Sequence, residues 1–178
     1  MALHFSNQEF LQRKTKVLQS MKEQNLDAIL MFRQESMYWL TGYDTFGYVF
    51  FQTLILDNKG NVILLTRAPD LRQAQNTSNI EDIRIWVDKD GSNPADDLKD
   101  ILDELSLKGK KVGIEYEAYG LTGRNALRLN KSLENYFNIE DQSELITKIR
   151  VVKSSEEIVY VKKAAELADL ALEQAWKH

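Results

Sequence analysis

The chain has 178 residues, of which 43% are hydrophobic and 28% are charged, the balance of an ordinary globular protein. Its net charge of −4 argues against a basic surface for nucleic acid or anionic lipid. The absence of cysteine excludes a disulfide framework, a thiolate nucleophile and a cysteine-bound zinc site. No apolar run approaches the roughly 20 residues of a membrane span, and residues 1–10 lack a signal-peptide pattern, so we expect a cytoplasmic protein.

The first elements expected along the chain are two helices on either side of a buried strand. Ser6 and Glu9 form a capping box, which opens an amphipathic helix. The continuous apolar run at residues 27–32 is typical of a strand that is buried on both faces. Residues 35–40 favour a short helix, and Gly42 ends it.

The later elements alternate between strand and helix, with one hairpin inserted. Residues 48–56 predict a long strand, and the turn at residues 57–60 joins it to an antiparallel partner over 61–66. The next expected elements are a helix over 68–75, a strand over 83–87, a helix over 93–105, a strand over 112–115, a helix over 122–136 and a strand over 137–140. This order predicts an α/β fold, a three-layer domain around a central mixed sheet whose central strands are 27–32 and 112–115.

The end of the chain predicts a helix with apolar residues on two faces. Ser154 and Glu157 form a second capping box at its start. One face carries Ile158, Val161, Ala165, Ala168 and Leu172, and the nearly opposite face carries Val159, Leu167 and Leu170. A helix that closes a small domain needs one buried stripe, so this pattern indicates a helix packed on both sides, with the second partner outside this chain. The alternative is an ordinary terminal helix with a few exposed leucines.

Aromatic residues are concentrated between Tyr38 and Phe51, where seven of 14 residues are aromatic against 10% over the whole chain. In a strand that begins near Tyr48, alternation would send Tyr48 and Phe50 to one face and Val49 and Phe51 to the other. Aromatic rings with one polar tip suit a wall that holds a small ligand. For Trp39, Phe50 and Phe51, core packing is the favoured interpretation; the loop residues Tyr43, Asp44 and Phe46 are candidates for a site.

Several motifs of catalysis and ligand binding are missing from the sequence. The two histidines, His4 and His178, belong to no metal-binding pair, and the paired carboxylates are expected on exposed helix faces. There is no G-x-S-x-G nucleophile motif and no glycine-rich phosphate cradle. The G-x-x-G at residues 120–123 has the spacing of a nucleic-acid clamp, but its surroundings are acidic. We therefore predict no catalytic residue and no metal ligand in this chain.

Four segments, of which residues 27–30 (DAIL) are the first, together resemble the N-terminal domain of the creatinase/prolidase/aminopeptidase P family, whose fold is ribonuclease H-like. The most specific is residues 149–158 (IRVVKSSEEI), because in such proteins this segment leads into the first helix of a "pita-bread" catalytic domain. Residues 37–43 (MYWLTGY) are less specific, and residues 111–115 (KVGIE) are the least specific.

The resemblance implies a supporting role in a hydrolase. Full-length members act on Xaa-Pro peptides, creatine or related small amidino and amide compounds. Most hold two divalent metal ions (Mn, Co or Zn) on five acidic and histidine side chains of the C-terminal catalytic domain, and creatinase works without metal. The resemblance implies that none of those five ligands lies in this chain. It also implies a homodimer in which the N-terminal domain lends loop residues to the partner's active site.

By position, the residues that the resemblance assigns to substrate binding are Tyr43, Asp44, Phe46 and Tyr48. A creatinase-like use of this loop needs an arginine for the substrate carboxylate, and residues 43–52 contain none. A parent enzyme of the Xaa-Pro dipeptidase or ectoine hydrolase type is therefore favoured over a creatinase.

Two classes of function follow. In the first, residues 1–146 are the non-catalytic N-terminal domain of an Xaa-Pro dipeptidase, and residues 147–178 are a linker and the truncated first helix of its catalytic domain. The partners are that catalytic domain, a second copy of the chain and a small peptide or amide substrate, and the chain alone is inactive. In the second, the chain is a self-contained α/β ligand-binding or interaction module whose last helix packs on its own core. A nucleic-acid binder ranks third because the chain is acidic.

Overall fold

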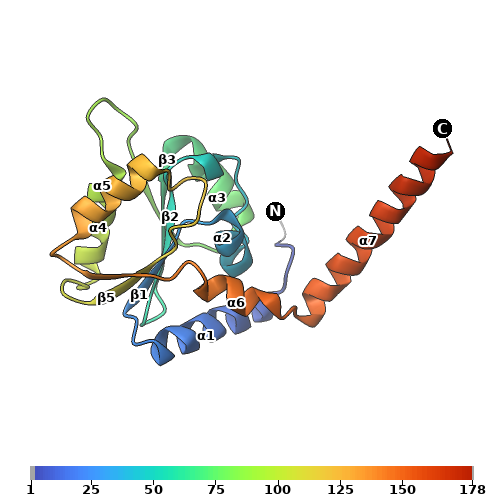
Figure 1. Cartoon of the computed structure of the whole chain (residues 1–178), viewed down its shortest axis with the longest axis horizontal. Coiled ribbons are helices and arrows are strands. Elements are labelled where there is room, and N and C mark those ends of the chain that lie inside the picture. Colours follow the sequence, from blue (N-terminus) through green and yellow to red (C-terminus); the bar gives the residue numbers. More distant parts are fainter. Residues whose placement is uncertain (1–2, 178) are drawn as a thin grey trace.

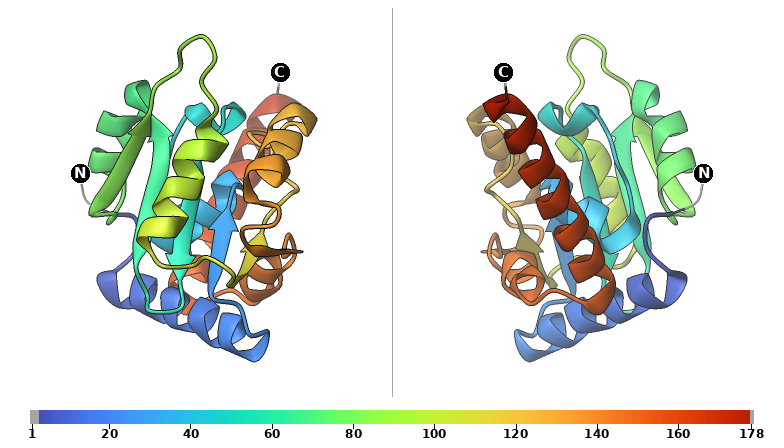
Figure 2. Two further views of the ribbon diagram at one scale, coloured as in Figure 1. Left: turned by 90° about the vertical axis from the view of Figure 1, so that its left-hand side faces the viewer. Right: turned by 90° about the vertical axis from the view of Figure 1, so that its right-hand side faces the viewer.

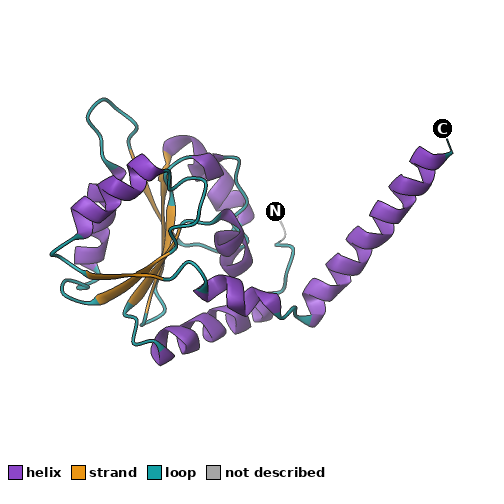
Figure 3. Cartoon of the chain, viewed as in Figure 1, coloured by secondary structure: helices purple, strands orange, loops and turns teal. Residues whose placement is uncertain are grey.

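A six-stranded mixed sheet lies between two sets of helices in the computed structural model, which describes residues 3–177 (Figure 1 and Figure 3). The strands are β1 (Ala28–Met31), β2 (Thr53–Asp57), β3 (Val62–Arg67), β4 (Asp82–Trp86), β5 (Lys111–Ile114) and β6 (Asn138–Asp141). The helices are α1 (Asn7–Glu23), α2 (Gln34–Thr41), α3 (Leu71–Thr77), α4 (Pro94–Glu104), α5 (Gly123–Leu133), α6 (Leu145–Val151) and α7 (Ser155–Trp176). Short 3₁₀ turns occur at Gly47–Val49 and Ala68–Asp70. The predicted α/β fold is thus confirmed.

The order of strands across the sheet is β4-β3-β2-β1-β5-β6. Strand β2 is antiparallel to both of its neighbours, and every other pair is parallel. Strands β2 and β1 are therefore the middle pair. The prediction of a central strand is confirmed for β1 but is wrong for β5, which lies next to the edge strand β6 because the hairpin strand β2 occupies the other side of β1. The parallel pair of β1 and β5 matters for the site, because the carboxyl ends of both strands meet at one edge of the sheet.

Alternate residues of the central strands supply two separate cores. Ala28 and Leu30 of β1 face the helices α4 and α5, whereas Ile29 and Met31 belong to the core under α1, α2, α3 and α6. Figure 1 shows these helices on the two faces of the sheet. Because both faces are covered, β1 and β2 read as continuous apolar runs in the sequence.

The long strand predicted over residues 48–56 is wrong in its first half. Strand β2 begins only at Thr53, and residues 47–49 form a 3₁₀ turn. The reason lies in the neighbouring strand: β1 ends at Met31, which pairs with Leu54, so the preceding residues have no β1 partner. The predicted alternation of Tyr48 and Phe50 against Val49 and Phe51 fails for the same reason, since only Phe51 of these four is buried.

The segment 141–148, expected to be a polar boundary, contains a helix that the sequence analysis missed. Helix α6 runs from Leu145 to Val151, and its residues Leu145 and Ile146 are buried in the core under α1. The boundary expected between residues 146 and 147 therefore falls inside this helix.

Helix α7 stands away from the domain and projects from its base (Figure 1 and Figure 2). Its predicted start is confirmed, because Ser154 and Glu157 form both hydrogen bonds of the capping box. None of its described residues is buried, and the apolar side chains of both faces are exposed. The last helix thus does not pack on the core of the described chain.

Candidate functional site

The loop between α2 and β2, residues 43–50, carries all four residues that the sequence predicts for substrate binding; we call it the aromatic loop. Gly42 ends α2 in the left-handed conformation (φ +82°), which turns the chain sharply into the loop. A β-carbon at Gly42 would lie 2.9 Å from the carbonyl oxygen of Thr77, so the turn also needs the missing side chain. The backbone conformation at the start of the aromatic loop is therefore fixed by Gly42.

Tyr43 anchors the aromatic loop from inside the protein. Its side chain is fully buried, and its hydroxyl donates a hydrogen bond of 2.8 Å to Oε1 of Gln52. Burial raises the pKa of the Tyr43 phenol above its usual value, so the group is neutral at physiological pH. The Tyr43 side chain therefore has no exposed surface that a ligand could contact in this chain, and its role is to hold the first residue of the aromatic loop in place.

The second half of the loop is tied to the start of α3. The hydroxyl of Thr45 donates to Asp70 and accepts from the backbone N–H of Gly47. Asp70 also forms an ion pair of 2.9 Å with Arg67, whose guanidinium lies 3.4 Å above the ring of Phe50. These contacts hold the backbone of the aromatic loop in place, while several of its side chains remain exposed to solvent. Phe46 is 88% exposed, and Asp44 and Tyr48 are exposed as well.

Beside the aromatic loop lies a cleft of about 540 Å³ at the carboxyl ends of β1 and β5. Ligands of open α/β sheets typically bind at such an edge. The ring of Tyr48 meets that of Tyr119 edge-on at 5.8 Å between centroids, which forms one wall. The cleft is lined by Arg33, Gln34, Glu35, Tyr48, Glu117, Ala118, Tyr119 and Arg150. Of the four predicted site residues, Tyr48 alone lines it in the described structure; Asp44 and Phe46 face solvent from the loop.

Glu115 directly follows β5 and is a fully buried carboxyl group that does not itself line the cleft. It accepts hydrogen bonds from the hydroxyl of Ser36 (2.6 Å) and the backbone N–H of Arg33 (3.1 Å). Burial raises the pKa of Glu115 to about 7, although both hydrogen bonds act in the opposite direction. Glu115 therefore connects the central sheet to the first turn of α2.

Arg33 and Arg150 carry the positive charge of the cleft, and they differ in their partners. The Arg33 guanidinium binds the carboxylate of Glu117 at 2.7 Å and donates to the hydroxyl of Thr147. Within residues 3–177, the guanidinium of Arg150 forms no hydrogen bond or ion pair, although it is half-buried. The carboxylate of Glu35 is exposed on the same cleft. The cleft thus offers an uncommitted cation, a carboxylate and an aromatic wall to a small polar molecule.

The sequence-based prediction of the site does not include Arg33, Glu115, Tyr119 or Arg150. One signal was available for two of them: Arg33 directly follows one predicted central strand, Glu115 is the last residue of the other, and parallel strands place such residues at the same edge. Nothing local in the sequence marks Tyr119 or Arg150, because only the fold brings them beside Tyr48.

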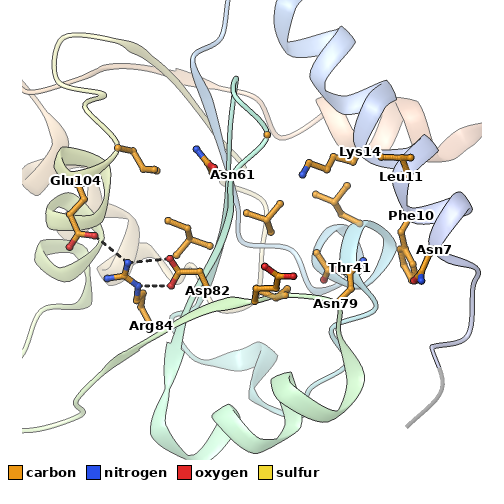
Figure 4. Close-up of a pocket in the computed structure, with 17 residues that line it drawn as sticks. Asn7, Phe10, Leu11, Lys14, Thr41, Asn61, Asn79, Asp82, Arg84 and Glu104 are labelled. Carbon is orange, nitrogen blue, oxygen red and sulfur yellow. Dashed lines mark hydrogen bonds and ion pairs between the residues drawn. The ribbon is translucent and has the colours of Figure 1, made fainter.

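A second hollow of about 750 Å³ lies along α1, the β2–β3 hairpin and β4 (Figure 4). Three of its charged residues are paired with one another, since Arg84 forms ion pairs with Asp82 and Glu104. None of the predicted site residues reaches it. We therefore take the cleft beside the aromatic loop as the candidate site.

In the described part of the chain, no group of three or more His, Asp or Glu side chains is placed to hold a metal ion. His4 contacts the hydroxyl of Tyr38 at 2.7 Å, and His178 lies outside the described residues. No helix among residues 3–177 is long and apolar enough to cross a membrane.

Comparison with known families identifies the fold. Residues 13–152 match the family model of the creatinase/prolidase N-terminal domain. The chain belongs to this family. The matched region extends from the first helix to the end of α6 and contains the aromatic loop and the whole cleft.

Among curated proteins, this creatinase/prolidase N-terminal domain is 29% identical over 180 residues to the "uncharacterized hydrolase/peptidase y4tM" of Sinorhizobium fredii, covering 97% of the chain and 46% of that protein. It is 25% identical over 173 residues to the ectoine hydrolase of Halomonas elongata, covering 93% of the chain and 43% of that protein. The chain thus spans less than half the length of these relatives. Among solved structures, a prolidase from Thermococcus sibiricus superposes with a TM-score of 0.80 at 20% identity, over 97% of this chain and 45% of that one.

Proposed function

We propose that this chain is the non-catalytic N-terminal domain of a cytoplasmic, metal-dependent hydrolase of the Xaa-Pro dipeptidase type. In the intact enzyme, it shapes the substrate cleft and supports a homodimer. Residues 1–146 form the domain proper, and residues 147–178 lead into the first helix of a catalytic domain. The substrate is a small peptide or amide.

The observation that carries this proposal is the coverage of the relatives. Two curated relatives that match over 93–97% of this chain are hydrolases by name, yet the chain spans only 43–46% of their length. The exposed apolar faces of α7 support the same conclusion, because a helix that leads into a second domain needs a partner on those faces. The metal ions (Mn, Co or Zn) would be held by residues outside this chain, where they would act as Lewis acids on the scissile amide.

The role proposed for the chain's own residues is orientation. Phe46 and Tyr48 are held on a loop whose backbone is tied at Tyr43, Thr45 and Gly47. A pre-ordered aromatic wall loses little entropy when a substrate binds, and it excludes water from one side of the reacting amide. Asp44, exposed on the same loop, faces the same partner surface in this proposal.

The first experiment compares the native protein, isolated with an antibody raised against this chain, with the 178-residue chain itself. We expect the native protein to be about twice as long, to hydrolyse glycyl-proline with Mn²⁺, Co²⁺ or Zn²⁺, and to scatter light as a dimer. We expect no hydrolysis by the 178-residue chain. Hydrolysis by the short chain, or none by the native protein with either glycyl-proline or ectoine, contradicts the proposal.

A substitution in the native protein tests the orientation role. Tyr48→Ala removes half of the aromatic wall and is expected to raise KM about tenfold, the loss of roughly 1.4 kcal/mol of binding. Leu127→Ala is the control, because Leu127 is also an exposed apolar residue but lies on α5 and does not line the cleft. Equal KM values for the two variants would show that Tyr48 does not contribute to substrate binding.

The alternative, a self-contained binding or interaction module, requires the last helix to pack on its own core. The described α7 has no buried residue, which counts against that alternative. The acidic net charge likewise gives no support to nucleic-acid binding.

A further inference from the structure

The first two turns of α7 are fastened to the domain by a compact set of contacts around Arg13. All hydrogen bonds and ion pairs between α7 and the rest of the described chain come from Glu156, Glu157 and Tyr160. The helix has 22 residues and is therefore roughly 33 Å long at 1.5 Å per residue. A rotation of about 10° at this attachment would move its far end by about 6 Å, so the contacts at its start govern where the helix points.

Arg13 is an unusual residue for its position, because it is a charged side chain with 1% exposure. The rings of Phe5, Phe10 and Trp39 surround its guanidinium, the nearest with its centroid at 4.0 Å. Its Nε donates to Glu9 at 2.8 Å, and its Nη1 donates to the carbonyl oxygen of Trp39 at 2.8 Å. The two bonds fix the plane of the guanidinium.

The remaining nitrogen of this fixed guanidinium reaches α7. Nη2 of Arg13 forms no hydrogen bond in the described structure, but it lies 3.3 Å from Oε1 of Glu157, which makes the contact an ion pair. Burying a guanidinium nitrogen that has no polar partner lowers the stability of the folded state, unless an anion lies close enough to compensate the charge. Glu157, whose side chain is 14% exposed, provides that anion.

The Glu157 carboxylate serves two structures at once. Its Oε2 accepts the backbone N–H of Ser154 at 2.8 Å, which closes the capping box of α7. Its Oε1 accepts the indole N–H of Trp39 at 2.9 Å, beside the ion pair with Arg13. The group that starts the helix is therefore also the group that attaches it to α1 and α2.

Tyr160 and Glu156 add further contacts between α7 and the N-terminal part of the chain, next to the ion pair of Arg13 and Glu157. The hydroxyl of Tyr160 donates to the carbonyl oxygen of His4 at 2.7 Å, and its ring meets that of Phe5 at 5.2 Å between centroids. Glu156 accepts from the hydroxyl and the backbone N–H of Ser6, the N-cap residue of α1. The starts of α1 and α7 are thereby joined directly.

We propose that Arg13, Trp39 and Glu157 form a positioning clamp that sets the direction of α7 relative to the sheet. With the proposed function as its basis, the clamp also sets where the catalytic domain stands relative to the aromatic loop. The three residues are positioning residues, since none of them lines the candidate cleft. The clamp itself does not depend on that function and can be tested on this chain.

The test is a distance measurement between two spin labels. Because the chain has no cysteine, Asp103→Cys on α4 and Asp169→Cys on α7 give a unique labelled pair at exposed positions. Glu157→Gln is introduced into this background, because glutamine still caps a helix at this position but cannot form the ion pair with Arg13. The matched control is Glu166→Gln, which removes the same charge from an exposed pair with Lys163 on the same helix.

We expect one narrow distance distribution in the parent chain, an unchanged width in Glu166→Gln and a width at least about twofold greater in Glu157→Gln. Far-UV circular dichroism should show equal helix content in all three, which separates loss of direction from loss of the helix. A broad distribution in the parent chain, or equal widths in the two variants, overturns the clamp. The link to catalysis is tested in the native protein, where Glu157→Gln should broaden the distance distribution and lower kcat/KM. Broadening without a loss of kcat/KM would support the clamp and refute its link to catalysis.

Discussion

The sheet and α7 use similar apolar residues with opposite results. Every residue of β1 is buried, and its alternating side chains fill two separate cores. Helix α7 buries none of its residues, although both of its faces carry leucine or valine. The sheet is held by packing, whereas α7 is held by its own hydrogen bonds, its capping box and the contacts of its first turns. Apolar pattern alone therefore does not say whether a segment is part of the core.

The largest expected difference between the two regions comes from equal truncations of leucine. Leu30→Ala in β1 should lower the free energy of unfolding by about 3 kcal/mol, because it leaves a cavity between two helices and the sheet. Leu167→Ala in α7 should change it by less than about 0.5 kcal/mol. Urea unfolding of both variants measures the contrast. A cost above 1 kcal/mol for Leu167→Ala would mean that α7 does pack in solution.

The buried Glu115 makes the stability of the domain depend on pH. Its pKa is about 7 in the folded protein and about 4.5 as the reference value, so the folded state binds this proton more tightly. The contribution of Glu115 to stability should therefore be fully present below pH 4.5, and up to about 3 kcal/mol of it should be lost as the pH rises through 7. Urea unfolding of the parent chain between pH 4.5 and 8 measures this loss.

Glu115→Gln should remove that decline, because the amide has no proton to lose, while its single oxygen keeps one of the two acceptor positions that Ser36 and Arg33 use. Glu117→Gln, whose side chain is 77% exposed, is the matched control and should leave the slope unchanged. The explanation fails if the two variants have the same pH dependence of the free energy of unfolding.

The aromatic loop is an intermediate case, with exposed side chains on a fixed backbone. Gly47→Ala should cost about 2 kcal/mol, because a β-carbon there would lie 2.5 Å from the Asp70 carboxylate, which Arg67 holds in place. Gly123→Ala at the start of α5 should be neutral, since open space surrounds that position. Denaturation midpoints of the two variants measure the difference, and equal midpoints would mean that the loop is not fixed.

The smallest expected difference between the domain and α7 comes from removing the N-cap residue of a helix in each. Thr122→Ala removes the N-cap of α5 and should lower the free energy of global unfolding by about 1 kcal/mol. Ser154→Ala removes the cap of α7 and should leave global unfolding unchanged, while hydrogen exchange in residues 155–165 becomes faster. A global loss of stability in Ser154→Ala would show that α7 unfolds together with the sheet.

Most of the fold was predictable from the sequence because local chemistry agreed with the tertiary structure. Ser6 and Ser154 are the N-caps of true helices, but the predicted capping box is complete only at the second of them, because the backbone N–H of Ser6 donates to Glu156 instead of Glu9. The run at residues 27–32 contains β1, a strand buried on both faces. The prediction over 48–52 failed because aromatic alternation does not reveal whether a neighbouring strand extends far enough to pair. Helix α6 was missed because its buried Leu145 and Ile146 stand among polar residues.

The candidate site was less predictable than the fold. The density of aromatic residues pointed to residues 38–51, but the sequence could not show that Tyr43 is buried in the core while Tyr48 lines the cleft. The cleft is built from four separate segments of the chain, and the position of Arg150 depends on a helix that the sequence did not reveal. Its geometry is a property of the fold.

The central claim is that this domain supports a catalytic half that covers α7. Hydrogen exchange of α7 in the 178-residue chain and in the native protein tests it most directly, with β1 as the internal reference. The account predicts that exchange in residues 158–176 is at least about 100-fold slower in the native protein, while β1 exchanges equally in both. Equal exchange of α7 in the two samples, or a native protein no longer than this chain, would contradict the account.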